Sequence, residues 1–149
     1  MPAGPNLVFH ASETFDMRGI MKPNAAGEEF AFGITSSADQ IIMAVGTVYV
    51  IIYKHAASAN WFIVSSQGAL NFDTGIPFVN QAYVEFRIRR INATDYGFTI
   101  DANAEIIKTI ALSNSNVVPV FAVVSATGAN ALLYIDYFGI KFAGLTGRM

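Results

Sequence analysis

Residues 83–100 of this 149-residue chain read Tyr83-Val-Glu-Phe-Arg-Ile-Arg-Arg-Ile-Asn-Ala-Thr-Asp-Tyr-Gly-Phe-Thr-Ile100. Apolar and polar side chains alternate before and after the cluster at 92–95. A period of two places successive side chains on opposite faces of a β-strand, so each half predicts a strand with one buried and one wet face. The Asn/Asp cluster between them is typical of a turn.

The same rhythm extends over most of the chain, with turn residues at intervals of about ten residues. Residues 15–22 and 29–34 alternate and are predicted as half-buried strands. Residues 48–53, 117–124 and 132–142 are apolar on both faces, which is typical of strands covered on two sides. These patterns predict an all-β fold, an antiparallel β-sandwich.

Helix signals are weak, and the best candidate, residues 102–112, contains β-branched residues that favour a strand after a turn at 101–104. The sequence shows no internal repeat and no linker. We therefore expect one domain over residues 1–149, with short arms at 1–6 and 144–149.

The composition leaves few polar groups for a surface. Charged residues form 13% of the chain and apolar residues 53%. A globule of this mass exposes about 7,400 Å², which gives roughly one charged side chain per 370 Å². Either a long loop or a neighbouring subunit must cover the outer faces of the apolar strands, and we expect a homo-oligomer, with a trimer favoured. The predicted interface residues are Tyr49, Ile51, Tyr53, Arg87, Arg89, Leu133 and Tyr137.

Several partner classes are excluded by charge and hydropathy. The net charge of −2 provides no basic footprint for nucleic acid. The longest uncharged apolar run, residues 41–53, is shorter than the roughly 20 residues of a spanning helix, so no membrane span is predicted. The first residues do not resemble a secretory signal, and the absence of cysteine excludes disulfides.

No catalytic, metal-binding or cofactor-binding residues are predicted. The carboxylates are scattered one per segment, and His10 and His55 have no ligand at metal spacing nearby. Asp136 stands out because alternation places it on one face with Tyr134, Phe138 and Ile140, where it would be a buried, hydrogen-bonded carboxylate.

Two aromatic and basic features have a structural and a functional interpretation. Trp61 could stack on a sugar ring, but it shares a face with Ile63 in a strand that looks internal, which favours core packing. The tyrosines could add to such a stacking platform, and they also suit interfaces, where the ring is buried and the hydroxyl finds a partner: Tyr49, Tyr53, Tyr83, Tyr96, Tyr134 and Tyr137. Arg87 and Arg89 lie on one strand face beside Glu85. They form either cross-strand ion pairs or a clamp for a partner's carboxylates, which the planar guanidinium suits.

The order of motifs in the second half is familiar. It runs Ser58-Ala-Asn-Trp-Phe-Ile-Val64, Phe72-Asp-Thr-Gly-Ile-Pro77, Tyr83-Val-Glu-Phe-Arg-Ile88, Gly97-Phe-Thr-Ile-Asp101, Val118-Pro-Val-Phe121 and Leu133-Tyr-Ile-Asp-Tyr-Phe138. Over residues 15–142 it resembles the concanavalin-like jelly-roll module of tailed-bacteriophage structural proteins. The resemblance implies a jelly roll at a virion surface.

The resemblance and the composition together favour a non-enzymatic structural protein of a phage particle. Our leading hypothesis is a head decoration or cement protein that binds the capsid as an oligomer. The alternative is a carbohydrate-binding receptor-recognition module of a tail fibre or spike, with tail proteins and host surface glycan as partners. A hydrolase of lectin-like fold is a third hypothesis, and it would need two acidic side chains facing each other across a groove.

Overall fold

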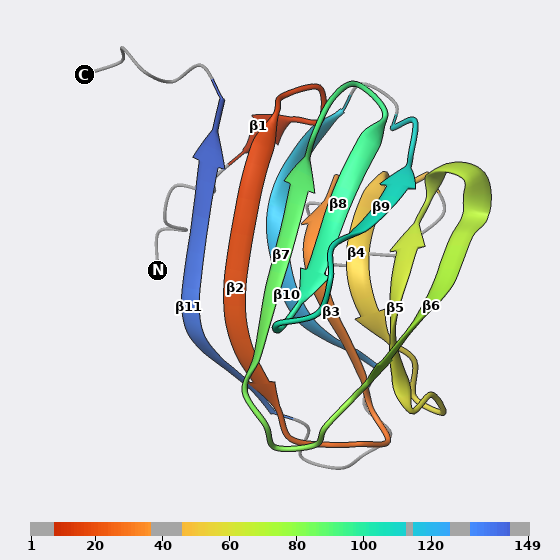
Figure 1. Ribbon diagram of the computed structural model, residues 1–149, viewed down its shortest axis with the longest axis vertical. Helices are drawn as coiled ribbons and strands as arrows, with labels where there is room; N and C mark the ends of the chain where they lie inside the picture. Colours follow the sequence, from red (N-terminus) through yellow and green to blue (C-terminus); the bar gives the residue numbers. More distant parts are fainter. Residues whose placement is uncertain (1–7, 37–45, 113–114, 126–131, 144–149) are drawn as a thin grey trace.

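A computed structural model describes residues 8–36, 46–112, 115–125 and 132–143. The chain folds into two stacked antiparallel sheets, which confirms the predicted β-sandwich (Figure 1). The six-stranded sheet has the order β1 (Phe9–His10), β10 (Asn116–Ser125), β3 (Glu29–Thr35), β4 (Tyr49–Lys54), β5 (Asn60–Ser65) and β6 (Leu70–Pro77). The five-stranded sheet has the order β11 (Leu133–Phe142), β2 (Phe15–Pro23), β7 (Val84–Arg90), β8 (Asp95–Ile100) and β9 (Ile106–Thr109).

The remaining regular element in the described part of the chain is a short 3₁₀ turn, η1 (Gln67–Ala69), between β5 and β6. Among the described residues, no helix has the length and apolarity that crossing a membrane requires. The predicted arms at 1–6 and 144–149 lie outside the described residues.

The main core lies between the two sheets and is rich in aromatic rings. The buried Trp61 packs edge-on against Phe86, with ring centroids 4.8 Å apart, and against Phe78 at 5.4 Å. Phe32 stacks on Phe86 at 5.4 Å. The glycan-stacking role considered for Trp61 is therefore wrong, because its ring is covered on all sides by the core.

A second apolar cluster lies on the outer face of the six-stranded sheet. It contains Ala31, Ile51, Tyr53, Val64 and Val120, with Tyr49, Phe62 and Ala122 partly buried against it. Ile51 is 0% and Tyr53 is 1% exposed in the single chain. The expectation that a second subunit covers these two residues is wrong, because the chain covers them itself.

This covered face is closely packed at β3 and β4. The predicted wet face of β3, which included Ala31 and Gly33, is buried. A Cβ on Gly33 would overlap the Val50 carbonyl oxygen and the Ile51 Cα of β4. Burial of Tyr53 raises the pKa of its hydroxyl, and a hydrogen bond with Glu29 adds to the shift.

A bulge in β11 changes which of its side chains share a face. Ile135 pairs with Met21 and Tyr137 pairs with Ile20, so Asp136 is an extra residue. Tyr134 and Tyr137 consequently lie on the same outer face, whereas uninterrupted alternation would separate them. Asp136 is exposed, so its predicted buried position is wrong.

Lys54 joins two loops at one end of the sandwich. Its side chain is buried, and Nζ donates to the carbonyl oxygens of Ala26 at 2.7 Å, His55 at 2.7 Å and Ala56 at 3.1 Å. The ammonium also lies 5.0 Å from the centroid of the Phe78 ring. Three carbonyl acceptors satisfy the buried charge and connect the β2–β3 loop to the β4–β5 loop.

Candidate functional site

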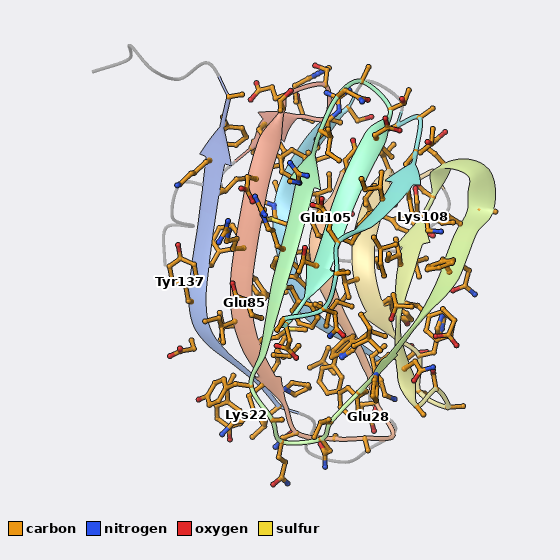
Figure 2. The ribbon with its side chains drawn as sticks, viewed as in Figure 1. Lys22, Glu28, Glu85, Glu105, Lys108 and Tyr137 are labelled. Atoms are coloured by element: carbon orange, nitrogen blue, oxygen red, sulfur yellow. The ribbon has the colours of Figure 1, made fainter. Side chains whose placement is uncertain are left out.

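The outer face of the five-stranded sheet carries a group of charged side chains together with three exposed tyrosines. Figure 2 looks onto this face, where Lys22, Glu85 and Tyr137 are labelled. We call this surface the charged face. The strand registers and the Lys22–Tyr83 contact arrange its side chains in four rows: Tyr134–Lys22–Tyr83, Tyr137–Ile20–Glu85, Gly139–Arg18–Arg87–Thr99 and Lys141–Asp16–Arg89–Gly97–Ile107. Three steps of two residues give this face a length of about 20 Å.

The first row lies at one end of the charged face and contains two tyrosines, so we call it the aromatic end. The Lys22 Nζ lies 5.0 Å from the ring centroid of Tyr83 and 4.8 Å from that of Tyr134. The two rings are 55% and 46% exposed, and Tyr137 in the next row is 52% exposed. Since the lysine attracts the faces of both flanking rings, their positions are restrained while much of their surface is free for a ligand.

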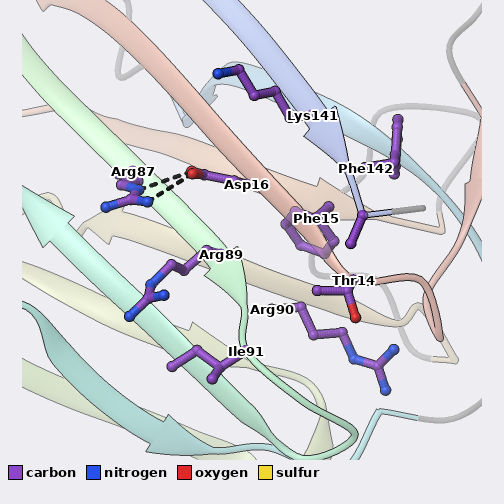
Figure 3. A pocket seen from close by; sticks show the side chains of 10 residues that line it. Thr14, Phe15, Asp16, Arg87, Arg89, Arg90, Ile91, Lys141 and Phe142 are labelled. Atoms are coloured by element: carbon purple, nitrogen blue, oxygen red, sulfur yellow. Dashed lines mark hydrogen bonds and ion pairs between the residues drawn. The ribbon is translucent and has the colours of Figure 1, made fainter. Parts of the chain in front are cut away.

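The fourth row borders a pocket of about 290 Å³ at the other end of the face (Figure 3). The pocket is lined by Thr14, Phe15, Asp16, Arg87, Arg89, Arg90, Ile91, Lys141, Phe142 and Ala143. Four of these residues are cations and one is a carboxylate, although the whole chain has a net charge of −2. We call it the basic pocket.

Two carboxylates orient Arg87 and Arg89 of β7. Arg87 donates from Nε to Asp16 Oδ1 at 2.8 Å and from Nη2 to Oδ2 at 2.7 Å. Arg89 donates in the same two-point manner to Glu105, with the Nη2–Oε2 distance at 2.6 Å. Both guanidinium planes are therefore fixed by paired hydrogen bonds.

These pairs also fix the charge of the carboxylates. The hydrogen bond from Arg87 lowers the pKa of Asp16, partly opposed by burial, and the hydrogen bond from Arg89 lowers the pKa of Glu105 in the same way. Both groups are ionised at neutral pH. Neither is suited to general-acid chemistry, which needs a raised carboxyl pKa.

The cations of the basic pocket are not all neutralised. Lys141 stands opposite Asp16 in the register, but among the described residues it makes no hydrogen bond and no ion pair. Arg90 donates from Nη2 to the Ala93 carbonyl oxygen at 2.9 Å, and its Nε, which has no hydrogen-bond partner among the described residues, is too deeply buried to reach a ligand. The pocket thus keeps unused donors and excess positive charge.

A smaller hollow of about 130 Å³ adjoins the basic pocket and shares Asp16 and Lys141 with it. Arg18, Tyr137 and Gly139 also line this hollow. A Cβ on Gly139 would overlap the hydroxyl and ring of Tyr137, so the tyrosine lies along the strand over this glycine. The Tyr137 ring therefore lies between the aromatic end of the charged face and the basic pocket.

The margin of the six-stranded sheet has a second polar group, but its side chains satisfy one another. His55 Nε2 lies 2.9 Å from Asn71 Oδ1, and Asn60 donates from Nδ2 to Asp73 Oδ1 at 3.0 Å. No three His, Cys, Asp or Glu side chains among the described residues are grouped so as to hold a metal ion. The charged face therefore offers more unused hydrogen-bond donors.

The predicted interface residues are divided between the two sheets. The charged face brings together Arg87, Arg89 and Tyr137, and the arginines form the cross-strand ion pairs that were one of the two interpretations. Leu133 is partly buried against the main core. Tyr49, Ile51 and Tyr53 lie on the covered face of the other sheet.

Sequence reasoning did not select Asp16, Lys22 or Lys141 as site residues, and it named Tyr83 and Tyr134 only among the tyrosines that could stack on a sugar or lie at an interface. Alternation placed Asp16 and Lys22 on the wet side of their strand, which was the available signal. Their neighbours come from strands more than sixty residues away, and no local pattern specifies that pairing.

Comparison with known proteins identifies the fold class. No protein-family model matches the sequence, and no curated protein matches it. Among solved structures, it is similar to chicken galectin 2, with a TM-score of 0.55, 10% identity, and coverage of 91% of this chain and 95% of that chain. A carbohydrate-binding module from Bacillus subtilis gives 0.57, 6% identity, and 89% and 77% coverage. An alginate lyase from an Alteromonas species gives 0.60, 10% identity, and 91% and 75% coverage.

These likenesses establish a concanavalin-like jelly roll, the fold of lectins and carbohydrate-binding modules. At such low identity they concern the fold alone, and the function has to be argued from the side chains of this chain.

Proposed function

We propose that this protein is a carbohydrate-binding module and that the charged face is its binding surface. The observation that carries the proposal is the alignment of three exposed tyrosines, Tyr83, Tyr134 and Tyr137, with cationic donors on one face about 20 Å long. Sugar rings have an apolar face that packs on aromatic rings and hydroxyls that need hydrogen-bond partners. Two of the fold neighbours, a carbohydrate-binding module and an alginate lyase, also favour a carbohydrate ligand.

We propose binding without catalysis. The carboxylates of the four rows and their partners are Asp16, Glu85 and Glu105. Two of these are held ionised by arginines, which leaves Glu85 without a second free carboxylate on the face to complete the pair that glycoside hydrolysis uses. Incubation with alginate and with neutral glucans should release no reducing ends and no unsaturated products, and detection of either would contradict this part of the proposal.

The resemblance to bacteriophage structural proteins supports a virion surface as the location, with the module on a tail fibre or spike facing host glycan. A decoration or cement role is the second candidate. Burial of Ile51 and Tyr53 removes two of the residues on which that role was based. The exposed residues of the edge strand β11, Ile135, Tyr137 and Phe138, still favour contact with another protein. Imaging of labelled protein on intact particles distinguishes a tail location from a head location.

A glycan array with purified protein tests the binding function, followed by titration of the best ligand. Tyr134→Ala and Tyr137→Ala should each weaken binding at least fivefold, because each removes a ring from the aligned surface. Val79→Ala is the matched control, since Val79 is equally exposed but lies off the charged face. Absence of any retained glycan, or equal binding by the tyrosine variants, would refute the proposal.

A further inference from the structure

We infer that the basic pocket binds an anionic oxygen group, a carboxylate or a sulfate, on an acidic polysaccharide, with Lys141 as the principal ionic contact. This inference rests on the proposed carbohydrate-binding function and specifies the chemical class of its ligand. It is based on the charges and hydrogen bonds around the pocket.

The first argument is the balance of charge. The pocket lining contains Arg87, Arg89, Arg90 and Lys141 against Asp16, and Glu105 neutralises Arg89 from outside the lining. Four cations against two carboxylates leave a local charge of +2 in a chain whose net charge is −2. A hollow with fixed positive charge attracts anions and strengthens their contacts when water is displaced.

The second argument is that Arg87 and Arg89 are held in position and still have unused N–H groups. Asp16 and Glu105 each occupy the Nε and Nη2 edge of one guanidinium, and among the described residues no hydrogen bond uses the Nη1 groups of Arg87 or Arg89. Gly97 makes room for this arrangement, because a Cβ there would overlap the Glu105 carboxylate. The remaining N–H groups are held in place for an anion at little cost in side-chain entropy.

The third argument is that the Lys141 ammonium has no hydrogen-bond or ion-pair partner within the described part of the chain. It lines both the basic pocket and the adjoining hollow that contains Tyr137. In Figure 3 its ammonium extends on the far side of β2 from Arg89, so the two cations flank Asp16. An anionic group seated there would meet Lys141 while the sugar ring that carries it lies toward Tyr137.

The experiment uses the full chain in affinity electrophoresis and calorimetry with three probes: oligogalacturonate, which carries carboxylates, dextran sulfate, which carries sulfates, and neutral dextran. Each probe is tested with the wild type, Lys141→Gln and Lys108→Gln. The control is also a lysine-to-glutamine change, but Lys108 lies over the Phe72 ring, away from the pocket. Thermal melts confirm that all three proteins are folded.

The expected result is binding of at least one anionic probe in preference to dextran, weakened about fivefold to tenfold by Lys141→Gln and unchanged by Lys108→Gln. The preferred anionic probe identifies the source of the group, carboxylate or sulfate. Equal binding of neutral and anionic probes, or no effect of Lys141→Gln, would overturn the inference and leave the proposed function intact. If neither these probes nor the array shows any glycan binding, the proposed function fails and the inference fails with it.

Discussion

The two sheets of this sandwich present opposite surfaces on their outer sides. The outer face of the six-stranded sheet is apolar and closed, with Ile51 and Tyr53 buried by the chain itself. The outer face of the five-stranded sheet is open and carries arginines, lysines and exposed tyrosines in four rows. A chain with 13% charged residues thus buries part of its apolar content on one outer face, whereas the charged face is left open.

The difference also explains why composition alone overestimated the need for partner subunits. The surface estimate treated the apolar outer strands as surface to be covered by another molecule. Part of that apolar area is a second core inside the monomer. An oligomer remains a proposal, and it rests on β11 rather than on β4.

The largest effect should come from opening the covered face. Ile51→Ala removes a fully buried side chain, so we expect the free energy of unfolding to fall by about 2–5 kcal/mol in urea denaturation. Ile107→Ala makes the same chemical change on the charged face, where the side chain is 56% exposed. It should cost less than about 0.5 kcal/mol. Equal losses in the two variants would mean that the faces do not differ as described.

A smaller effect separates two glycines that face different neighbours. Gly33→Ala places a methyl group against the backbone of β4 and should destabilise the protein by about 1–3 kcal/mol. In Gly97→Ala the methyl group meets the end of the flexible Glu105 side chain, which can swing aside. We therefore expect a loss of about 1 kcal/mol or less, chiefly from the Arg89–Glu105 pair. Unfolding curves measure both values, and a larger loss for Gly97→Ala would contradict this account.

The smallest effect is the dependence on pH that the two arginine–carboxylate pairs of the charged face contribute. The native pKa values of Asp16 and Glu105 lie below their unfolded values, so their contribution is complete above about pH 5 and is lost as the pH falls through the native pKa values. The pairs are partly exposed, so each contributes about 1 kcal/mol or less.

Unfolding of Asp16→Asn and Glu105→Gln measured between pH 3 and 7 tests this expectation. Both variants should be less stable than the wild type at pH 7 and converge with it in acid. Ile107→Ala should keep the wild-type slope. A constant difference between variant and wild type over the whole range would show that the ion pairs do not titrate with folding.

Much of the fold follows from the residues themselves. Alternation located the strands around Phe86 and Phe98, and the internal character of its strand placed Trp61 in the core. Local patterns succeed here because alternate side chains of a strand point to opposite faces, so alternation in the sequence shows directly which face is buried.

The failures have equally physical causes. Asp136 is a bulge residue, and one extra residue reverses the facing of everything after it, which no period-two pattern can express. Ala31 and Gly33 look like a wet face because small residues fit both water and close packing. The charged face could be predicted only in part, since Arg87 meets Asp16 across 71 positions of sequence.

The lysine that links the loops at one end of the sandwich is a built-in probe of local opening. Lys54 is one of four lysines in a chain without cysteine, and its ammonium is enclosed by three carbonyl groups. An amine-directed reagent can reach it only when those two loops separate. Mass spectrometry can compare the rate of acylation of Lys54 with that of the exposed Lys141. The ratio of the two rates would report how often the loops at this end open, without any engineered label.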